Sequence, residues 1–261
     1  MTTRRTAALV LSAAVTATAL AGCGGAGVRQ TFNDTEKVKV TEIVMAGGSG
    51  DVLVRTAPIA ETRITRIVHR ATDPGASYRL DGTVLHIDTD CGHDCSVSYQ
   101  IEAPAGVAVR GELRSGDIGL DGVGATDLRL TSGDIMVRNA SGAVTARSTS
   151  GDISVLDGKG GATIEATSGN VRVVNITGGP VDAQVTSGDV EVQLTAPNSV
   201  TARANSGDVN VMVPAGSYRV TADTGSGDHT ITGIVDDPSA KNVINVHTGS
   251  GDARVSGQPT A

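Results

Sequence analysis

Residues 149–155 read Thr-Ser-Gly-Asp-Ile-Ser-Val, and close variants of this stretch recur along the chain. Ser-Gly-Asp, once Ser-Gly-Asn, is followed by an apolar-x-apolar pattern in every copy except one, where His229 replaces the first apolar residue. The copies begin at Ser49, Ser115, Ser132, Ser150, Ser168, Ser187, Ser206, Ser226 and Ser250. From the second copy onward, successive starting positions are 17 to 24 residues apart. A nearly constant period of this size indicates a stack of equivalent structural units.

The unit around Ser150 shows what each copy contains. Residues 144–148 alternate between inward and outward positions before the corner, and Ile153 and Val155 alternate after it. A period of two is typical of strands with one buried face. So small a unit cannot bury its apolar face alone, but it can when stacked on its neighbours. The sequence predicts an all-β fold: a right-handed parallel β-solenoid of about eight coils of 17–24 residues. The alternative is a long sandwich of antiparallel hairpins.

Each residue of the corner has an expected role. The glycine should adopt a positive φ, which glycine reaches without steric cost. The serine keeps the inward parity and should join a buried ladder of hydroxyls, whereas the aspartate faces outward and should accept N–H groups of its own turn. The predicted turn residues are Gly116, Gly133, Gly151, Gly169, Gly188, Gly207, Gly227 and Gly251, with Asp117, Asp134, Asp152, Asp189, Asp208, Asp228 and Asp252.

Two functional interpretations of the corners were weighed against this structural one. A column of stacked carboxylates could bind Ca²⁺, but Asn170 interrupts it and the calcium nonapeptide pattern does not match. The serines lack the Gly-x-Ser-x-Gly elbow of a nucleophile. Repetition also argues against catalysis, because an active site needs one unique set of residues, whereas the corners are equivalent. We therefore expect no enzyme activity, no cofactor and no metal.

The N-terminus has the features of an export signal. Arg4 and Arg5 precede an uncharged stretch over residues 6–20, which is short for a membrane span. Leu20-Ala-Gly-Cys23 then resembles a bacterial lipobox. We expect a signal peptide over residues 1–22, diacylglyceryl anchoring to the membrane through Cys23, and a tether over residues 23–36. The alternative is an ordinary signal peptide with an incidental cysteine.

The period breaks between the first two corners, where Ser49 and Ser115 are 66 residues apart. Asp81-Gly82 lies between apolar runs in this interval, which is a strong hairpin signal. A stack of coils needs its end covered. We therefore expect entry strands and an N-terminal β-hairpin cap over residues 37–110, solenoid repeats over 111–256, and a tail over 257–261.

Cys91 and Cys95, with His86 and His93 nearby, form the most distinctive local cluster of reactive or metal-binding residues. Two thiols and two imidazoles could bind zinc. However, the Cys-x₃-Cys spacing is not that of a usual zinc knuckle, and an exported protein favours oxidised thiols. A disulfide between Cys91 and Cys95 is therefore the main expectation, with a zinc site and free thiols as alternatives.

Composition limits the partners. Aromatic residues are 2% of the chain and the formal net charge is −7. No basic patch with interleaved aromatic residues occurs, so nucleic acid is not an expected partner. Few aromatic residues and many glycines suit a thin core of stacked layers.

These elements together resemble a known bacterial family, the "putative adhesin" or toast-rack-like proteins. The resemblance rests on the lipobox, on Tyr99-x-Ile101-Glu-Ala-Pro104, and on the runs Arg114-Ser-Gly-Asp-Ile118, Thr131-Ser-Gly-Asp-Ile135 and Thr149-Ser-Gly-Asp-Ile153. It implies a non-enzymatic β-repeat lipoprotein of the bacterial cell envelope, on the extracytoplasmic side. We expect an adhesin-like binding or scaffold module whose partner is an unidentified envelope protein or polysaccharide. The alternatives are a signalling partner in envelope stress and a β-helix enzyme acting on polysaccharide.

Overall fold

The computed structural model describes residues 29–69, 75–93 and 95–258. Cys23 and the expected signal peptide lie outside these residues. The described residues form strands and turns and contain no helix, which confirms the all-β class. Accordingly, no membrane-spanning helix is found in the ranges given above.

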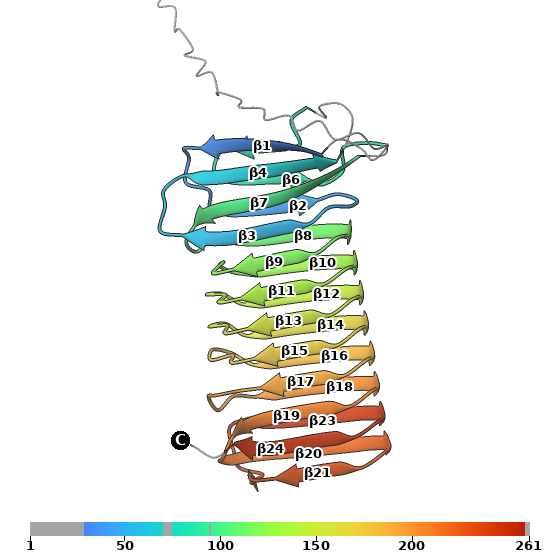
Figure 1. Ribbon diagram of the computed structural model, residues 1–261. Coiled ribbons are helices and arrows are strands. Elements are labelled where there is room, and N and C mark those ends of the chain that lie inside the picture. Colours follow the sequence, from blue (N-terminus) through green and yellow to red (C-terminus); the bar gives the residue numbers. More distant parts are fainter. Residues whose placement is uncertain (1–28, 70–74, 94, 259–261) are drawn as a thin grey trace, which may run out of the picture.

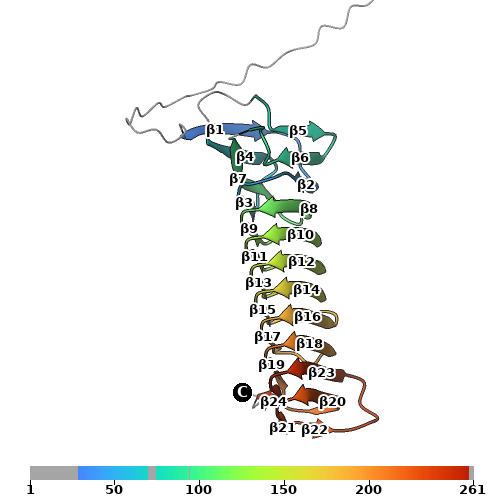
Figure 2. The same cartoon turned by 90° about the vertical axis from the view of Figure 1, so that its right-hand side faces the viewer.

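The strands form two long sheets that face one another in a tall, narrow stack (Figures 1 and 2). In spatial order, the first sheet contains β1 (Arg29–Glu36), β4 (Thr62–His69), β7 (Ser96–Pro104), β3 (Val52–Ala57), β9 (Ile118–Asp121), β11 (Ile135–Arg138), β13 (Ile153–Leu156), β15 (Val171–Val174), β17 (Val190–Gln193), β19 (Val209–Pro214), β24 (Ala253–Gln258) and β21 (His229–Thr232). The second sheet contains β22 (Val235–Asp236), β20 (Ser217–Ser226), β23 (Val243–Ser250), β18 (Val200–Ser206), β16 (Val181–Ser187), β14 (Ala162–Ser168), β12 (Val144–Ser150), β10 (Thr126–Ser132), β8 (Ala108–Ser115), β2 (Glu42–Ala46), β6 (Val84–Asp88) and β5 (Tyr78–Asp81).

Neighbouring strands of the repeats pair in parallel, with the corners in register. Ser132 lies opposite Ser115 on one side and opposite Ser150 on the other. In the other sheet, Ile135 lies opposite Ile118 and Ile153 in the same way. Parallel pairing in a constant register is what a stack of equivalent units requires. The alternative of antiparallel hairpins is therefore wrong for the repeats.

The core lies between the two sheets and consists of inward-facing aliphatic side chains. Small and branched residues such as Ala146, Ile153 and Val190 are fully buried in the repeats. The few aromatic residues lie toward the ends of the stack. Phe32, Tyr78 and Tyr99 belong to the N-terminal strands, and Tyr218 belongs to the C-terminal ones. Layers of equal width leave no room for an aromatic side chain in the middle of the stack, which explains the unusual composition.

The N-terminal end is covered by antiparallel strands, as a cap would require. β1 pairs with β4, β4 pairs with β7, and β5 and β6 form the hairpin around Gly82. Arg66 lies between the two sheets here, paired with Asp34 at 3.1 Å and stacked over the rings of Phe32 and Tyr78. An arginine this buried is stabilised by the carboxylate and by the ring faces together.

One expected boundary in this region needs correction. Residues 29–36 were expected to be part of a tether, but they form β1 and pair along their whole length with β4. The entry strands expected at the start of residues 37–110 are β2 and β3. These two strands belong to the stack itself, because the corner at Ser49 is bridged in parallel to the corner at Ser115.

At the C-terminal end the order of strands in space departs from the order in sequence. β23 and β24 lie between the layer of β18 and β19 and the layer of β20 and β21. The corners therefore stack in the order Ser206, Ser250, Ser226. The expected tail at residues 257–261 is partly wrong, because Gly257 and Gln258 belong to β24 and pair with β19.

Candidate functional site

The corner glycines adopt the predicted positive φ, and the stack adds a second reason for glycine. Gly151 has φ 121°. A Cβ atom on Gly151 would lie 2.0 Å from the carbonyl oxygen of Gly133 in the neighbouring layer. Backbone approaches backbone at each corner, so no larger residue fits there without movement of the chain.

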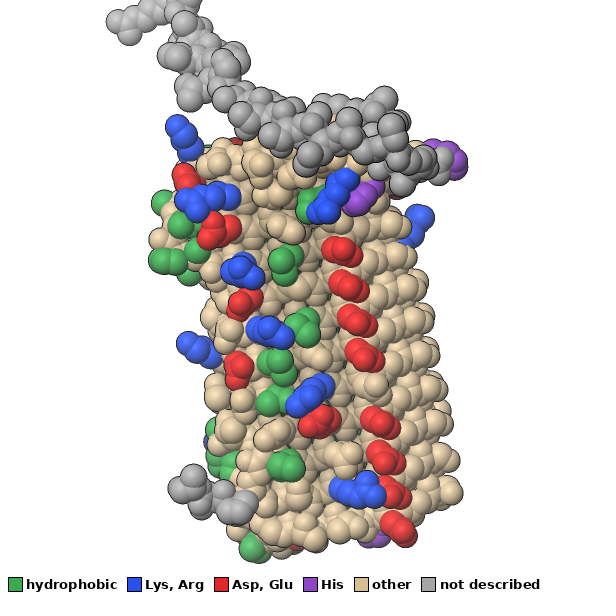
Figure 3. All heavy atoms as spheres, viewed as in Figure 1, with side chains coloured by type: hydrophobic (Ala, Val, Ile, Leu, Met, Phe, Trp, Pro, Cys, Tyr) green, Lys and Arg blue, Asp and Glu red, His purple; other side chains and the backbone are tan. Residues whose placement is uncertain are grey.

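The corner aspartates do not serve their own turns as expected. The Oδ1 atom of Asp117 accepts the backbone N–H of Asp134 at 3.0 Å, and Oδ1 of Asp134 accepts the N–H of Asp152 at 2.8 Å. Each carboxylate therefore ties its layer to the next one. Figure 3 shows the resulting vertical column of acidic side chains along one edge of the stack. The column comprises Asp51, Asp117, Asp134, Asp152, Asn170, Asp189, Asp208, Asp252 and Asp228.

Asn170 was expected to interrupt this column, but it continues the hydrogen bonding. Its Oδ1 atom accepts the N–H of Asp189 at 3.0 Å, and its own N–H is donated to Asp152 at 2.7 Å. An amide oxygen accepts a hydrogen bond as a carboxylate oxygen does, without the charge. Asn170 therefore removes one negative charge from the middle of the column and keeps the layers joined.

The corner serines were expected to be buried, and this was wrong. Ser132, Ser150 and Ser168 are exposed, as are the threonines before them. In β8, β10, β12, β14, β16 and β18 the last buried residue lies two positions before the serine, as at Ser148. The alternation of buried and outward residues ends there, and Thr149 and Ser150 both face solvent. The predicted ladder of buried hydroxyls is therefore absent from the described corners.

The described residues contain no group of three or more His, Cys, Asp or Glu side chains placed to bind a metal ion. Two members of the aspartate column, Asp208 and Asp252, instead pair with Arg254. Cys91 and Cys95 form the expected disulfide. Their sulfurs are not free to bind zinc, so the zinc alternative is wrong and so is the alternative of free thiols.

A long groove lies on the outer face of the second sheet. It has a volume of about 1080 Å³ and runs along the stack from β6 and β2 to β23. One side, here called the charged wall, consists of outward side chains that lie directly opposite one another on successive strands: Glu112, Arg129, Arg147, Glu165, Gln184, Arg203 and His247. Two residues further along each strand is the threonine wall: Arg114, Thr131, Thr149, Thr167 and Thr186, followed by Asn205.

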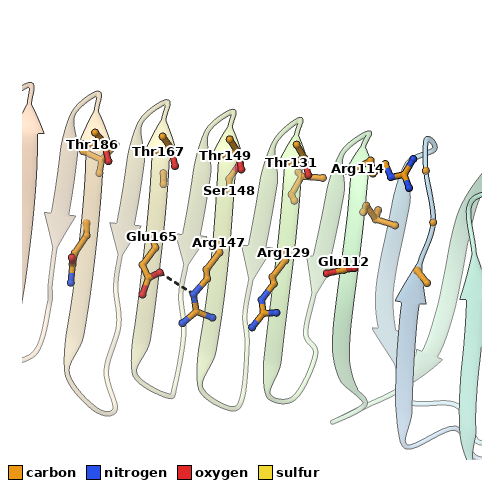
Figure 4. Close-up of a pocket in the computed structure, with 18 of the residues that line it drawn as sticks. Glu112, Arg114, Arg129, Thr131, Arg147, Ser148, Thr149, Glu165, Thr167 and Thr186 are labelled. Atoms are coloured by element: carbon orange, nitrogen blue, oxygen red, sulfur yellow. Dashed lines mark hydrogen bonds and ion pairs between the residues drawn. The ribbon is translucent and has the colours of Figure 1, made fainter.

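The groove lies between these two rows of outward side chains. Buried residues of small or medium size, such as Ala166 and Val185, form its floor. Figure 4 shows the threonines in one row near the corners and the charged residues in a second row along the middle of the strands. Repetition therefore yields two parallel rows of side chains along the axis of the stack.

Ion pairs with nearby carboxylates neutralise only some of the arginines that line the groove. Arg147 pairs with Glu165 at 2.9 Å and approaches Asp127 at 4.0 Å. Within the described part of the chain, Arg129, Arg203 and Arg114 at the β8 end make no ion pair; Arg129 and Arg114 are exposed, and Arg203 is half-buried. These guanidinium groups can therefore bind an anionic group of a ligand bidentately.

The buried tyrosines of the cap are structural. Tyr99 is 1% exposed, and its hydroxyl donates to the carbonyl oxygens of Ser77 at 2.6 Å and Asp88 at 3.0 Å. Burial raises the pKa of Tyr99 to about 12. The pKa of Tyr78 is also raised, chiefly by burial and then by Asp34 and Glu36. Both hydroxyls therefore remain protonated donors at neutral pH.

Comparison with known families identifies the fold. The profile of the family described as Toastrack DUF4097 matches residues 31–166 and 158–256. The chain belongs to the Toastrack DUF4097 family. The search of curated proteins found no significant match.

Solved structures resemble this Toastrack chain at low sequence identity. A protein from Bacteroides fragilis that is described as a "putative adhesin" matches at 12% identity with a TM-score of 0.50, over 87% of this chain and 96% of its own. A protein from Parabacteroides distasonis with the same description matches at 14% identity with a TM-score of 0.43, over 86% of this chain and 96% of its own. At this identity the Bacteroides fragilis structure supports the fold of the Toastrack chain and nothing further about its activity.

The groove of this Toastrack protein was not predicted from the sequence, although part of its signal was there. When the repeats are aligned on the corner serine, polar residues recur three positions before it and threonine one position before it. Such an alignment gives the two rows. It does not show that a continuous hollow lies between the rows.

Proposed function

We propose that this protein is a bacterial cell-envelope lipoprotein, anchored on the extracytoplasmic side through Cys23, and that its stack is a non-catalytic, adhesin-like binding or scaffold module. The groove is the observation that supports a binding role. It crosses the strands of several layers in one straight line, and both of its walls carry groups that donate or accept hydrogen bonds. Such a surface fits an extended polymer of the envelope, or an extended part of an envelope protein, better than a compact ligand.

The proposal includes a right-handed winding of about eight coils. Parallel strands joined by short crossovers follow this hand in almost all known sheets. The winding matters for the function because it keeps equivalent side chains in line, so that a weak contact in one layer can be repeated in the next.

The binding role is tested by filling the groove from its threonine wall. Thr167→Met introduces a long, uncharged side chain at an exposed position in the middle of the groove. Thr163→Met is the matched control, because Thr163 is exposed on the same strand but outside the groove. We expect Thr167→Met, but not Thr163→Met, to lower capture of the protein on isolated cell-envelope material sharply. Equal capture of the two variants would contradict a binding role for the groove.

Anchoring is tested separately at Cys23. Cys23→Ser removes the thiol to which the diacylglyceryl group would be transferred. We expect this variant to incorporate no labelled fatty acid and to leave the membrane fraction. Unchanged labelling and fractionation would contradict the anchor and leave the groove unaffected.

A further inference from the structure

We infer that the groove binds a linear acidic glycan, a polymer of sugar rings that carries carboxylate or phosphate groups. This inference rests on the proposed binding function of the groove and names the chemical class of its ligand.

The charge of the groove differs from that of the whole chain. Between β8 and β23 the two walls carry four arginines and two glutamates, an excess of two positive charges, on a chain with a net charge of −7. The four arginines are Arg114, Arg129, Arg147 and Arg203, and the glutamates are Glu112 and Glu165. Asp88 and Asp90 line the cap end, so the anionic groups of the ligand are expected to lie from β8 onward.

The arginines without ion pairs are spaced along the groove. Arg114 and Arg129 lie on adjacent strands and on opposite walls, so they face an anionic group from both sides. Arg203 is four strands beyond Arg129, which corresponds to about 19 Å. A polymer that carries charge at intervals can reach both places at once, and the second contact then forms at high effective concentration.

The threonine wall supplies uncharged hydrogen-bonding groups, which the arginines do not. Thr131, Thr149, Thr167 and Thr186 place exposed hydroxyl-bearing side chains on successive strands, about 4.8 Å apart. This spacing is close to the length of one sugar ring in an extended glycan. Each ring would therefore meet a hydroxyl that can both donate and accept a hydrogen bond.

Two other classes of polyanion fit the groove less well. Single-stranded nucleic acid is generally held by aromatic side chains that stack on its bases, and the lining of this groove contains no aromatic residue. An extended polypeptide is generally held through a free sheet edge or through pockets for alternate side chains. Here the backbone is already paired on both sides of β10, β12, β14 and β16, and the floor is closed by buried side chains.

The inference is tested with the full chain and three probes of similar length: polygalacturonate, its neutral methyl ester, and polyglutamate. We expect polygalacturonate to bind, more weakly as salt is added, and the other two to bind at least tenfold more weakly. Arg129→Gln together with Arg203→Gln should weaken polygalacturonate binding about tenfold, because two charge-assisted contacts are lost.

The matched control replaces Arg55 and Arg138 by Gln, because these two arginines are exposed on the other sheet. This variant has the same net charge as the groove variant and should bind within about twofold of the parent chain. Equal weakening of both variants, or equal binding of the ester, would overturn the inference. Tighter binding of polyglutamate would assign the groove to a polypeptide instead.

Failure of this inference can be told apart from failure of the proposed function. If Thr167→Met lowers capture on envelope material while polygalacturonate does not bind, the groove binds a ligand of another class. If neither result is obtained, both the ligand class and the binding function are wrong.

Discussion

At the scale of single residues, the corner glycine and the corner aspartate do different work in joining the layers. The glycine allows the backbones of two layers to approach, and the aspartate bridges them with a side-chain hydrogen bond. Neither role belongs to the turn alone, because in both cases the contact is made with the neighbouring layer. The strict recurrence of Gly and Asp in the sequence follows from the stacking.

A comparison of Gly151→Ala with Gly106→Ala separates two costs of a side chain at the corner: the strain of a positive φ and the clash with the neighbouring layer. The new Cβ would both oppose the positive φ and lie 2.0 Å from the Gly133 carbonyl oxygen. Gly106→Ala is the control, because Gly106 also has a positive φ but no atom lies within 4 Å of its Cβ position. We expect a loss of about 1 kcal/mol at Gly106 and more than about 3 kcal/mol at Gly151. Equal losses in urea unfolding would contradict the close approach.

Asn170→Asp tests the electrostatics of the aspartate column. The substitution keeps the oxygen that accepts the Asp189 N–H but places a charge between Asp152 and Asp189. We expect the free energy of unfolding to fall by up to about 1 kcal/mol at low salt, and the loss to shrink as salt is added. Asn170→Ala should be destabilising at every salt concentration, since it removes the acceptor. A salt-independent effect of Asn170→Asp would contradict the repulsion.

At the scale of elements, the cap differs from the repeats in the way it is held together. The repeats are held by parallel pairing and thin aliphatic layers. The cap is antiparallel and uses three of the four aromatic side chains, together with the buried Arg66. A cap of this kind closes the edge of the stack and protects it from pairing with other chains.

Tyr99 gives the cap a characteristic pH dependence. The unfolded tyrosine ionises near its ordinary pKa of 10, whereas burial raises the folded pKa to about 12. The stability is therefore complete below pH 10 and is lost as the pH rises toward 12, at up to about 1.4 kcal/mol per pH unit. Tyr99→Phe should show a shallower decline than the parent chain across this range. Parallel curves would show that Tyr99 does not contribute.

The strands and corners of the repeats could be predicted from the sequence because each repeat carries its own alternating pattern. The hydrogen-bond partner of each aspartate could not be predicted, because the sequence is the same whether the side chain bonds its own turn or the next layer. The exposure of the serines was missed for a similar reason. Alternation predicts an inward position at Ser150, but the alternation ends at Ser148, and Thr149 and Ser150 are both exposed.

At the scale of the whole molecule, the order of the layers at the C-terminal end could not be predicted from the sequence either. All corners have the same register, so the sequence does not say which layer lies next to which. The only hint was the longer step between Ser226 and Ser250, which leaves enough chain for β23 and β24 to return into the stack. The last two layers are therefore stacked in an order that differs from their order in the sequence.

Truncation tests this order of layers. Removal of residues 238–261 takes away β23 and β24, and with them the long pairing partners of β20 and β21. We expect amides of residues 217–232 to lose their protection from hydrogen exchange. A chain that ends at Pro214 should keep most of its protection, since β18 and β19 lose β23 and β24 but still pair with β16 and β17. Continued protection of residues 217–232 would mean that β20 and β21 pair directly with β18 and β19.

The central claim is that the corner aspartates join successive layers, and amide hydrogen exchange in Asp134→Ala tests it most directly. The variant loses the acceptor for the Asp152 N–H but keeps its own N–H bonded to Asp117. We predict faster exchange at residue 152 and unchanged slow exchange at residue 134. Faster exchange confined to the turn of residue 134, with residue 152 unaffected, would contradict the claim.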